Sequence, residues 1–195
     1  QGVDAVLAAI EIAWGFGCPL VLAAGSHLPE GICPADGRKM IVEGLQACQP
    51  AAEQANVTLA IENFGVAPRL QCCAKDCLEV LDALPSVRFV FDTGNFHFCG
   101  EDPIANLSLF AGRTCHVHVK DWIRTERPEI ADVSGALLGT GIIPNAELCR
   151  IIVSLGHIEN FSLETGAPGD KFDAVRRDML TLREWIDASD DPVHP

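Results

Sequence analysis

The stretch TCHVHVK, residues 114–120, has the alternation of a β-strand. Successive side chains of a strand point to opposite faces, so His116, His118 and Lys120 share one face, while a cysteine and two valines share the other. A strand covered by helices on both sides of an open sheet usually reads as a continuous apolar run. One polar face instead fits the wall of a barrel, where every second side chain points into the lumen.

Two further runs repeat this pattern. Residues 57–62 place Glu62 on a face with small residues, opposite two aliphatic side chains. Residues 160–165 place Glu164 on a face with a serine, opposite a phenylalanine and a leucine. All three runs therefore indicate strands with one apolar face and one face of small or polar residues. This pattern favours a barrel with a functional site at one end of its lumen.

Short β-branched runs alternate with helical patterns along the chain. We expect strands over 19–24, 57–62, 87–92, 114–120, 136–141 and 160–165. We expect helices over 3–15, 36–55, 74–83, 103–111, 145–155 and 171–187, with a looser segment over 123–135. This alternation predicts an α/β fold with a parallel sheet. No break in composition marks a second domain, so one domain over residues 1–195 is expected.

Composition narrows the classes of function. Hydrophobic residues make up 48% of the chain, but none of its apolar runs reaches the length of a membrane span, about 18 residues. The N-terminus has no secretion signal pattern, so a cytoplasmic location is expected. The formal net charge is −13, with 27 acidic and 14 basic residues. A field of that sign repels phosphate backbones and argues against nucleic-acid binding.

The nine cysteines are an odd number scattered over the chain, which suits thiols in a reducing compartment better than a disulfide framework. Cys72, Cys73 and Cys77 are close together in sequence. No second Cys or His pair follows them at zinc-site spacing. We therefore expect them to pack as thiols around a helix rather than to form a structural metal site.

Four ionisable residues fall at or near the C-terminal ends of separate predicted strands: Glu62, Asp92, His118 and Glu164. Active sites of parallel α/β barrels are built at that end. Any one of these residues alone would be interpreted as an ordinary solvent-exposed residue at the end of a strand. Three carboxylates that converge there, however, would repel one another unless a cation were bound between them. Oxygen-rich ligands favour Mn²⁺ or Mg²⁺, and Co²⁺, Fe²⁺ and Zn²⁺ are compatible.

Five motifs occur in a recognisable order: IENFG at 61–65, FVFDTGNFHFCGEDP at 89–103, HVHVKD at 116–121, LLGTGIIP at 137–144 and FSLET at 161–165. Together they resemble the xylose isomerase-like TIM-barrel superfamily, in its sugar phosphate isomerase/epimerase branch. The resemblance implies that Glu62, Asp92, His118 and Glu164 bind one divalent metal ion. It also places His116 one layer deeper, as a packed or supporting residue, and Lys120 and Asp121 at the rim.

Several residues are candidates for substrate contacts. Asn95 stands where many relatives have a histidine three residues after the aspartate, and it can hydrogen-bond a hydroxyl but cannot donate a proton as an acid. His97, Lys120, Arg124 and His27 are further candidates near the mouth. The Gly139-Thr140-Gly141 turn lies near the usual phosphate-binding loops of such barrels, although a Gly-x-Gly is more often only a tight turn.

The chain is shorter than the family it resembles would lead one to expect. A complete barrel takes ~250 residues, whereas this chain has 195 and six predicted strands. The motif order predicts a (β/α)8 TIM barrel lacking its first two strands. Exposed strand edges would favour association, so a homo-oligomer is considered.

The resemblance implies a metal-dependent isomerase or epimerase acting on a small sugar or sugar phosphate. The metal would stabilise an enediolate, while Glu62 and Glu164 remove and return the proton. Two alternatives remain open: a dehydratase of an inosose-like or dehydroshikimate-like substrate, and a non-catalytic barrel that binds metal or sugar. An apurinic-site endonuclease is disfavoured by the acidic charge.

Overall fold

The computed structural model describes residues 2–25, 28, 30–65, 70–126 and 132–190. The chain forms two compact units, one comprising Gln1–Val90 with Phe98–Glu101, and the other Phe91–His97 with Asp102–Pro195. Strand β3 (Arg88–Asp92) begins in the first unit and ends in the second. The expectation of a single domain over 1–195 stays a prediction.

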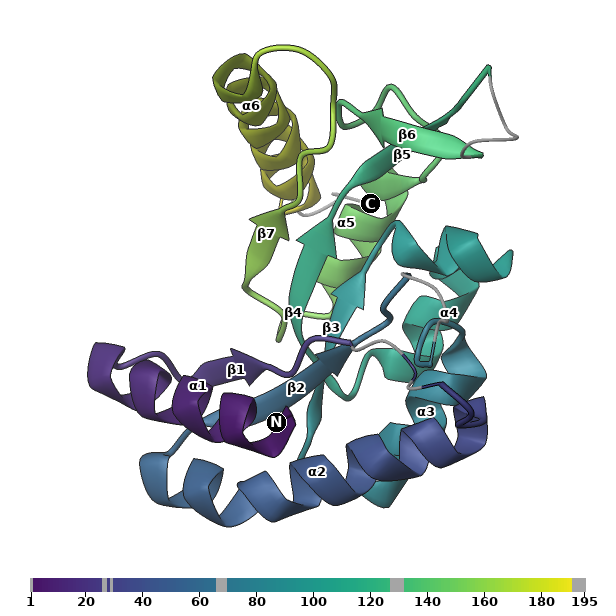
Figure 1. Cartoon of the computed structure of the whole chain (residues 1–195). Coiled ribbons are helices and arrows are strands. Elements are labelled where there is room, and N and C mark those ends of the chain that lie inside the picture. The colour runs from purple at the N-terminus through teal and green to yellow at the C-terminus, as the bar shows by residue number, and fades with distance from the viewer. Residues whose placement is uncertain (1, 26–27, 29, 66–69, 127–131, 191–195) are drawn as a thin grey trace. The chain divides into compact units, whose positions relative to one another are not determined.

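The first unit contains helices packed against parallel strands (Figure 1). Its elements are α1 (Gly2–Phe16), β1 (Leu20–Leu22), α2 (Pro34–Ala55), β2 (Thr58–Glu62), α3 (Ala74–Ala83) and the start of β3. Strand β2 pairs in parallel with both β1 and β3, and its last residue, Glu62, lies opposite Val90. Helix α2 ends at Ala55, and the next residue, Asn56, caps it in a left-handed conformation, φ 52°, with its N–H donating to carbonyls of the last turn. Leu59 and Ile61 are buried in the core as expected, but Ala60 and Glu62 on the other face of β2 are buried too.

The second unit repeats this arrangement. It contains a 3₁₀ helix η1 (Asn95–Cys99, up to His97), α4 (Pro103–Phe110), β4 (Thr114–Val119), β5 (Asp121–Arg124), β6 (Val133–Ala136), α5 (Asn145–Ser154), β7 (Phe161–Leu163) and α6 (Lys171–Asp190). Strands β4 and β7 are parallel, with His118 opposite Ser162. The rings of Phe91, Phe96 and Phe110 pack against one another in the core in tilted arrangements, at centroid distances of 5.4 and 6.0 Å.

The strand order of the main sheet is β1-β2-β3-β4-β7, so it has five strands rather than the six expected. The prediction of a strand over 136–141 is wrong, because β6 ends at Ala136 and a turn follows. The segment expected to be loose contributes instead to an antiparallel hairpin of β5 and β6, in which Asp121 pairs with Ala136. Among the described residues, no helix is both long enough and apolar enough to span a membrane.

Candidate metal centre

The ends of strands β3, β4 and β7 bring three of the predicted ligands together. Just past Asp92, the N–H of Thr93 donates to the carbonyl of His118 at 3.0 Å, which joins the ends of β3 and β4. The N–H of Glu164 donates to the carbonyl of Val119, also at 3.0 Å, which joins β4 to the end of β7. Because parallel strands end at one edge of a sheet, Asp92, His118 and Glu164 meet there.

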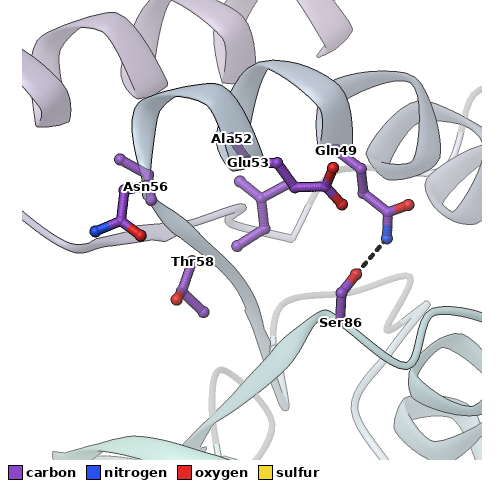
Figure 2. Close-up of a pocket in the computed structure, with 8 residues that line it drawn as sticks. Gln49, Ala52, Glu53, Asn56, Thr58 and Ser86 are labelled. Carbon is purple, nitrogen blue, oxygen red and sulfur yellow. Dashed lines mark hydrogen bonds between the residues drawn. The ribbon is translucent and has the colours of Figure 1, made fainter.

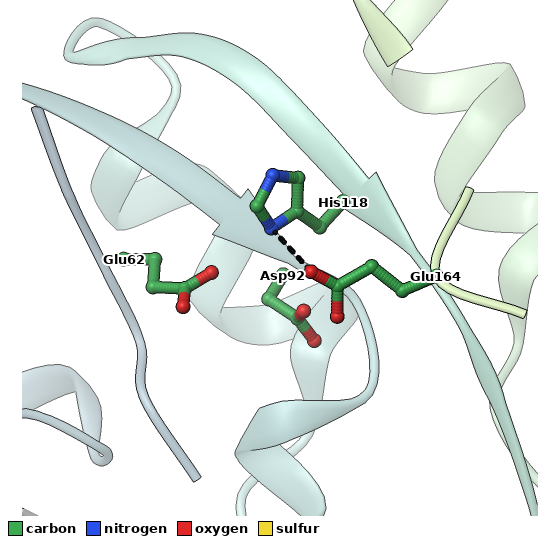
Figure 3. Close-up of side chains that lie close together, drawn as sticks. All are labelled: Glu62, Asp92, His118 and Glu164. Carbon is green, nitrogen blue, oxygen red and sulfur yellow. Dashed lines mark ion pairs between the residues drawn. The ribbon is translucent and has the colours of Figure 1, made fainter. Parts of the chain in front are cut away.

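Figure 3 shows these three side chains with Glu62, which ends β2. Each of the four offers one ligand atom, and these atoms lie within 4.8 Å of one another. The His118 Nδ1 lies 3.2 Å from Glu164 Oε1. Three carboxylates and one imidazole are a donor set suited to a divalent cation. The residues named from the sequence therefore form a cluster that could hold such an ion.

Asp92 is fully buried and its two oxygens have different partners. Oδ1 accepts hydrogen bonds from the backbone N–H groups of Gly94 and Asn95, at 2.9 and 2.8 Å. Oδ2 lies 2.9 Å from Nζ of Lys120. The first oxygen thus fixes the carboxylate on the turn after β3, while the second faces a cation.

Lys120 supplies positive charge to this cluster. Its ammonium group pairs with both Asp92 and Glu164 and lies 3.4 Å from the side-chain oxygen of Asn95. Burial lowers the pKa of Lys120, but the two carboxylates raise it by more, so the net pKa is raised and the group stays charged. One ammonium cannot balance three carboxylates, so the cluster retains an excess of negative charge that suits a divalent cation.

A glycine is required beside Lys120. A Cβ placed on Gly94 would lie 2.6 Å from both Cγ of Lys120 and Nε1 of Trp122. The same indole nitrogen donates to the carbonyl of Gly94 at 3.0 Å. The Asp-Thr-Gly-Asn sequence therefore combines a carboxylate, a close backbone approach and an amide side chain within four residues.

His116 lies on the same face as His118, with the two rings 5.4 Å apart and nearly perpendicular. Its Nε2 is 2.8 Å from Oγ of Ser162, on the neighbouring strand β7. Burial, and then the adjacent His118, lower the pKa of His116. A neutral imidazole that bonds to a serine fits a supporting role under His118.

The residues predicted to contact substrate have different surroundings in the structure. Asn95 is buried beside Lys120, whereas Nε2 of His97 lies 3.1 Å from Oδ2 of Asp132. Arg124 is exposed on β5. His27 lies outside the described residues.

Asp121 has a role that the sequence did not reveal. We expected it at the rim, but it is only 2% exposed. Oδ1 accepts from the N–H groups of Trp122 and Ile143, and Oδ2 from those of Gly139 and Gly141, at 2.9 to 3.1 Å. A Cβ on Gly141 would lie 2.2 Å from Oδ1, so only glycine allows this approach.

The backbone N–H groups of the Gly-Thr-Gly turn are consequently all hydrogen-bonded to acceptors of the protein itself. Besides the two glycine amides held by Asp121, the N–H of Thr140 donates to Leu137 and that of Ile142 to Trp122. Each backbone amide from 139 to 143 thus has a partner in the protein. The turn serves to position the chain between β6 and α5, and its amides are not directed at a phosphate.

An open pocket of about 330 Å³ lies at the opposite, N-terminal end of β2. Gln49 and Glu53 of α2, together with Thr58 and Ser86, line part of it (Figure 2). The amide of Gln49 donates to Ser86 Oγ at 2.5 Å. None of the four clustered residues lines this pocket, so it is separate from the candidate metal centre.

Comparisons with known proteins support the fold. A curated relative, the 3-oxo-isoapionate decarboxylase of Pectobacterium atrosepticum, is 33% identical over 103 residues. That match spans 51% of this chain and 36% of the relative.

Two solved structures match most of the chain. A zinc-bound IOLI protein is 18% identical, with a TM-score of 0.81 over 97% of this chain and 70% of that one. An L-ribulose 3-epimerase is 17% identical, with a TM-score of 0.77 over all of this chain and 72% of that one. These likenesses confirm the predicted α/β-barrel fold.

The family model for the xylose isomerase-like TIM barrel matches residues 1–185, nearly the whole chain. The motifs, the strand order and the clustered strand-end residues agree with that match. The chain belongs to the xylose isomerase-like TIM-barrel family.

Proposed function

We propose that this chain carries out, alone or as part of a longer protein, a metal-dependent isomerisation or epimerisation of a small carbohydrate. The observation that carries the proposal is the cluster of Glu62, Asp92, His118 and Glu164, whose ligand atoms lie within 4.8 Å of one another. The proteins of similar fold include an L-ribulose 3-epimerase, which supports a sugar as the proposed class of substrate.

The four clustered residues would hold one divalent ion, with Mn²⁺ favoured and Mg²⁺, Co²⁺ or Zn²⁺ compatible. Such an ion supplies a Lewis acid that increases the acidity of a C–H bond next to a carbonyl. A zinc ion is bound in one of the structural relatives. The carboxylate of the buried Asp92 is held in place, because one of its oxygens accepts from two backbone amides.

The proton transfer would fall to Glu62 and Glu164. One carboxylate removes the proton next to the carbonyl and the other returns it, each acting as general base and then acid. Glu164 is 41% exposed, so a substrate can reach it. Return to the opposite face of the same carbon gives an epimer, whereas return to the neighbouring carbon gives an aldose–ketose isomer.

Lys120 and Asn95 would orient the substrate. The Lys120 ammonium stays charged beside the cluster, and it can donate to a carbonyl or hydroxyl oxygen. Asn95 Oδ1 lies 3.4 Å from it, so both groups can bond to neighbouring hydroxyls of one sugar. His97 and Arg124 remain candidates for contacts farther from the reacting carbon.

A second candidate is a decarboxylase, favoured by the 33% identity to the 3-oxo-isoapionate enzyme. Loss of carbon dioxide beside a carbonyl also leaves a negative charge that a cation and Lys120 can stabilise. Only one proton donor is then required. The two reactions therefore differ in whether both glutamates are essential.

The test uses the full chain with each metal in turn, incubated with aldoses, ketoses and 3-oxo acids in heavy water. Glu62→Gln and Glu164→Gln should each lower turnover about 10²- to 10⁴-fold, the usual effect of losing a general acid–base group. One variant should still exchange the substrate hydrogen without forming product. Glu43→Gln, at an exposed position of α2, is the matched control.

Chelation should abolish activity, and Mn²⁺ or Co²⁺ should restore it. Parental turnover and exchange in both glutamine variants would rule out the proposed proton transfer. Release of carbon dioxide from a 3-oxo acid, with one glutamate dispensable, would favour the decarboxylase. Cleavage of DNA at abasic sites would instead indicate an endonuclease.

A further inference from the structure

Two cysteines far apart in sequence meet inside the first unit. The Sγ atoms of Cys72, just before α3, and Cys99, at the end of η1, are 2.8 Å apart. All nine cysteines lie within the described residues and are thiols. A disulfide requires an S–S distance of about 2.0 Å, so less than 1 Å of movement separates this thiol pair from a bond.

The neighbouring thiols are engaged elsewhere. The thiol of Cys73 lies 3.0 Å from Asp76 Oδ2, and that of Cys77 donates to the carbonyl of Gln71 at 3.3 Å. Burial, followed by the bond to Asp76, raises the pKa of Cys73 to about 11, and burial raises that of Cys77 well above its usual range. These two thiols are therefore poor nucleophiles, and Cys72 and Cys99 form the pair closest to bonding distance.

The pair also joins segments that support the candidate metal centre. Gln71, next to Cys72, donates from its side chain to the carbonyl of Glu62 at 3.2 Å and accepts from the N–H of Phe64 at 2.8 Å. Beside Cys99, the carboxylate of Glu101 accepts from the N–H of Ala74 at 2.9 Å. Oxidation of the pair would thus fasten the backbone next to Glu62.

We propose that Cys72 and Cys99 are an oxidation site, at which a hydroperoxide converts the two thiols into a reversible disulfide. Cys99 is partly exposed and Cys72 is fully buried, so the peroxide meets Cys99 first. The Cys99 sulfur attacks the peroxide oxygen and becomes a sulfenic acid, and the leaving group departs as water or an alcohol. The Cys72 sulfur then displaces water to form the disulfide, so two thiols lose two electrons and the peroxide gains them.

The disulfide would link residues that are 27 positions apart in sequence. It should therefore slow hydrogen exchange of backbone amides in the segment around Gln71. This inference does not depend on the proposed sugar chemistry. Its readouts are the covalent state and the backbone protection, which can be measured without substrate.

The experiment treats the full chain, free of added reductant, with one equivalent of hydrogen peroxide, then blocks remaining thiols and maps the peptides by mass spectrometry. Loss of two hydrogens from the intact mass and a Cys72–Cys99 cross-link, both reversed by dithiothreitol, are expected. Exposed Cys18 and Cys33 are replaced by serine in every sample to remove bridges between molecules.

Cys73→Ser should keep the cross-link, whereas Cys99→Ser and Cys72→Ala should each lose it. Because Cys72→Ala can disturb the core, the partly exposed Cys99→Ser is the deciding variant. In the parent, oxidation should slow hydrogen exchange at the amide of Phe64, and Cys99→Ser should show no such change. A bridge through Cys73 or Cys77, oxidation only to sulfinic acid, or an unchanged Phe64 amide would overturn the proposal.

Discussion

Asp92 and Asp121 occupy comparable places, each at a turn beside the end of a strand, and both are almost completely buried. Asp92 uses one oxygen to accept two backbone amides and directs the other to Lys120. Asp121 uses both oxygens and accepts from four amides, one from the adjacent Trp122 and three from residues 139–143. Asp92 therefore keeps one carboxylate oxygen available for binding a cation. Asp121 is instead a structural hub, meaning that both of its oxygens hold backbone amides in place.

The difference lies in how many amides each turn presents. The turn after β3 offers Gly94 and Asn95 to one oxygen, and the helical continuation of η1 directs the following amides elsewhere. The Gly139–Ile143 loop folds back over Asp121 and offers amides to both oxygens. A carboxylate whose two oxygens already accept from four amides has little lone-pair capacity left for a metal.

The largest effect is expected from Asp121→Ala. Four buried or partly buried amides would lose their acceptor, which should lower the free energy of unfolding by about 3–5 kcal/mol. Urea titration followed by circular dichroism measures this loss. The control is Asp102→Ala, because Asp102 caps α4 through a single amide, that of Ile104, and should cost about 1 kcal/mol. Equal losses in both variants would show that Asp121 is not a hub.

Asp92→Asn should reverse this pattern. The asparagine oxygen can still accept from Gly94 and Asn95, but its NH₂ group then faces the Lys120 ammonium. We therefore expect the unfolding free energy to fall by about 1–2 kcal/mol, less than for Asp121→Ala. Affinity for Mn²⁺ or Zn²⁺ should fall at least about 100-fold, since loss of a supporting partner alone costs 10- to 100-fold. Isothermal titration calorimetry measures the affinity. Retained affinity together with a large loss of stability would make Asp92 a second structural carboxylate.

Much of the fold follows from local pattern. Helix 74–83 matches α3 residue for residue. In β4 the valines at 117 and 119 are buried and the two histidines are partly exposed, as the alternation predicted, whereas in β2 both faces are buried. The strand predicted over 136–141 fails because Asp121, some 20 residues earlier, holds Gly139 and Gly141 in a turn. The β5–β6 hairpin was missed for a similar reason, since its pairing joins segments on either side of residues 127–131.

The candidate site was predictable to the extent that it depends on strand ends. Glu62, Asp92, His118 and Glu164 could be named because parallel strands end at the same edge, and the family resemblance selected the same four residues. The difference between Asp92 and Asp121 depends on amides brought in by tertiary folding. The approach of Cys99 to Cys72 also spans 27 residues, and local pattern carries no signal for it.

Asp178 of α6 lies between these two cases and provides the finest test of the comparison. It is 1% exposed, its Oδ1 accepts from the N–H of Leu138 at 2.9 Å, and its Oδ2 accepts from the hydroxyl of Thr165 at 2.8 Å. Thr165→Val keeps the side-chain shape but removes one of these bonds and leaves a buried carboxylate oxygen without its hydroxyl. We expect a loss of about 1 kcal/mol in unfolding free energy.

Because Thr165 follows the proposed ligand Glu164, the same variant asks whether Asp178 also positions the metal centre. The backbone of Glu164 is separately held by the carbonyl of Val119, so metal affinity should change less than about 3-fold, well below the cost of losing a supporting partner. Calorimetry on Thr165→Val, with Thr165→Ser as the variant that retains the hydroxyl, measures both quantities. A drop in affinity of tenfold or more that Thr165→Ser does not show would place Asp178 with Asp92 as part of the metal centre rather than with Asp121 as a support of the fold.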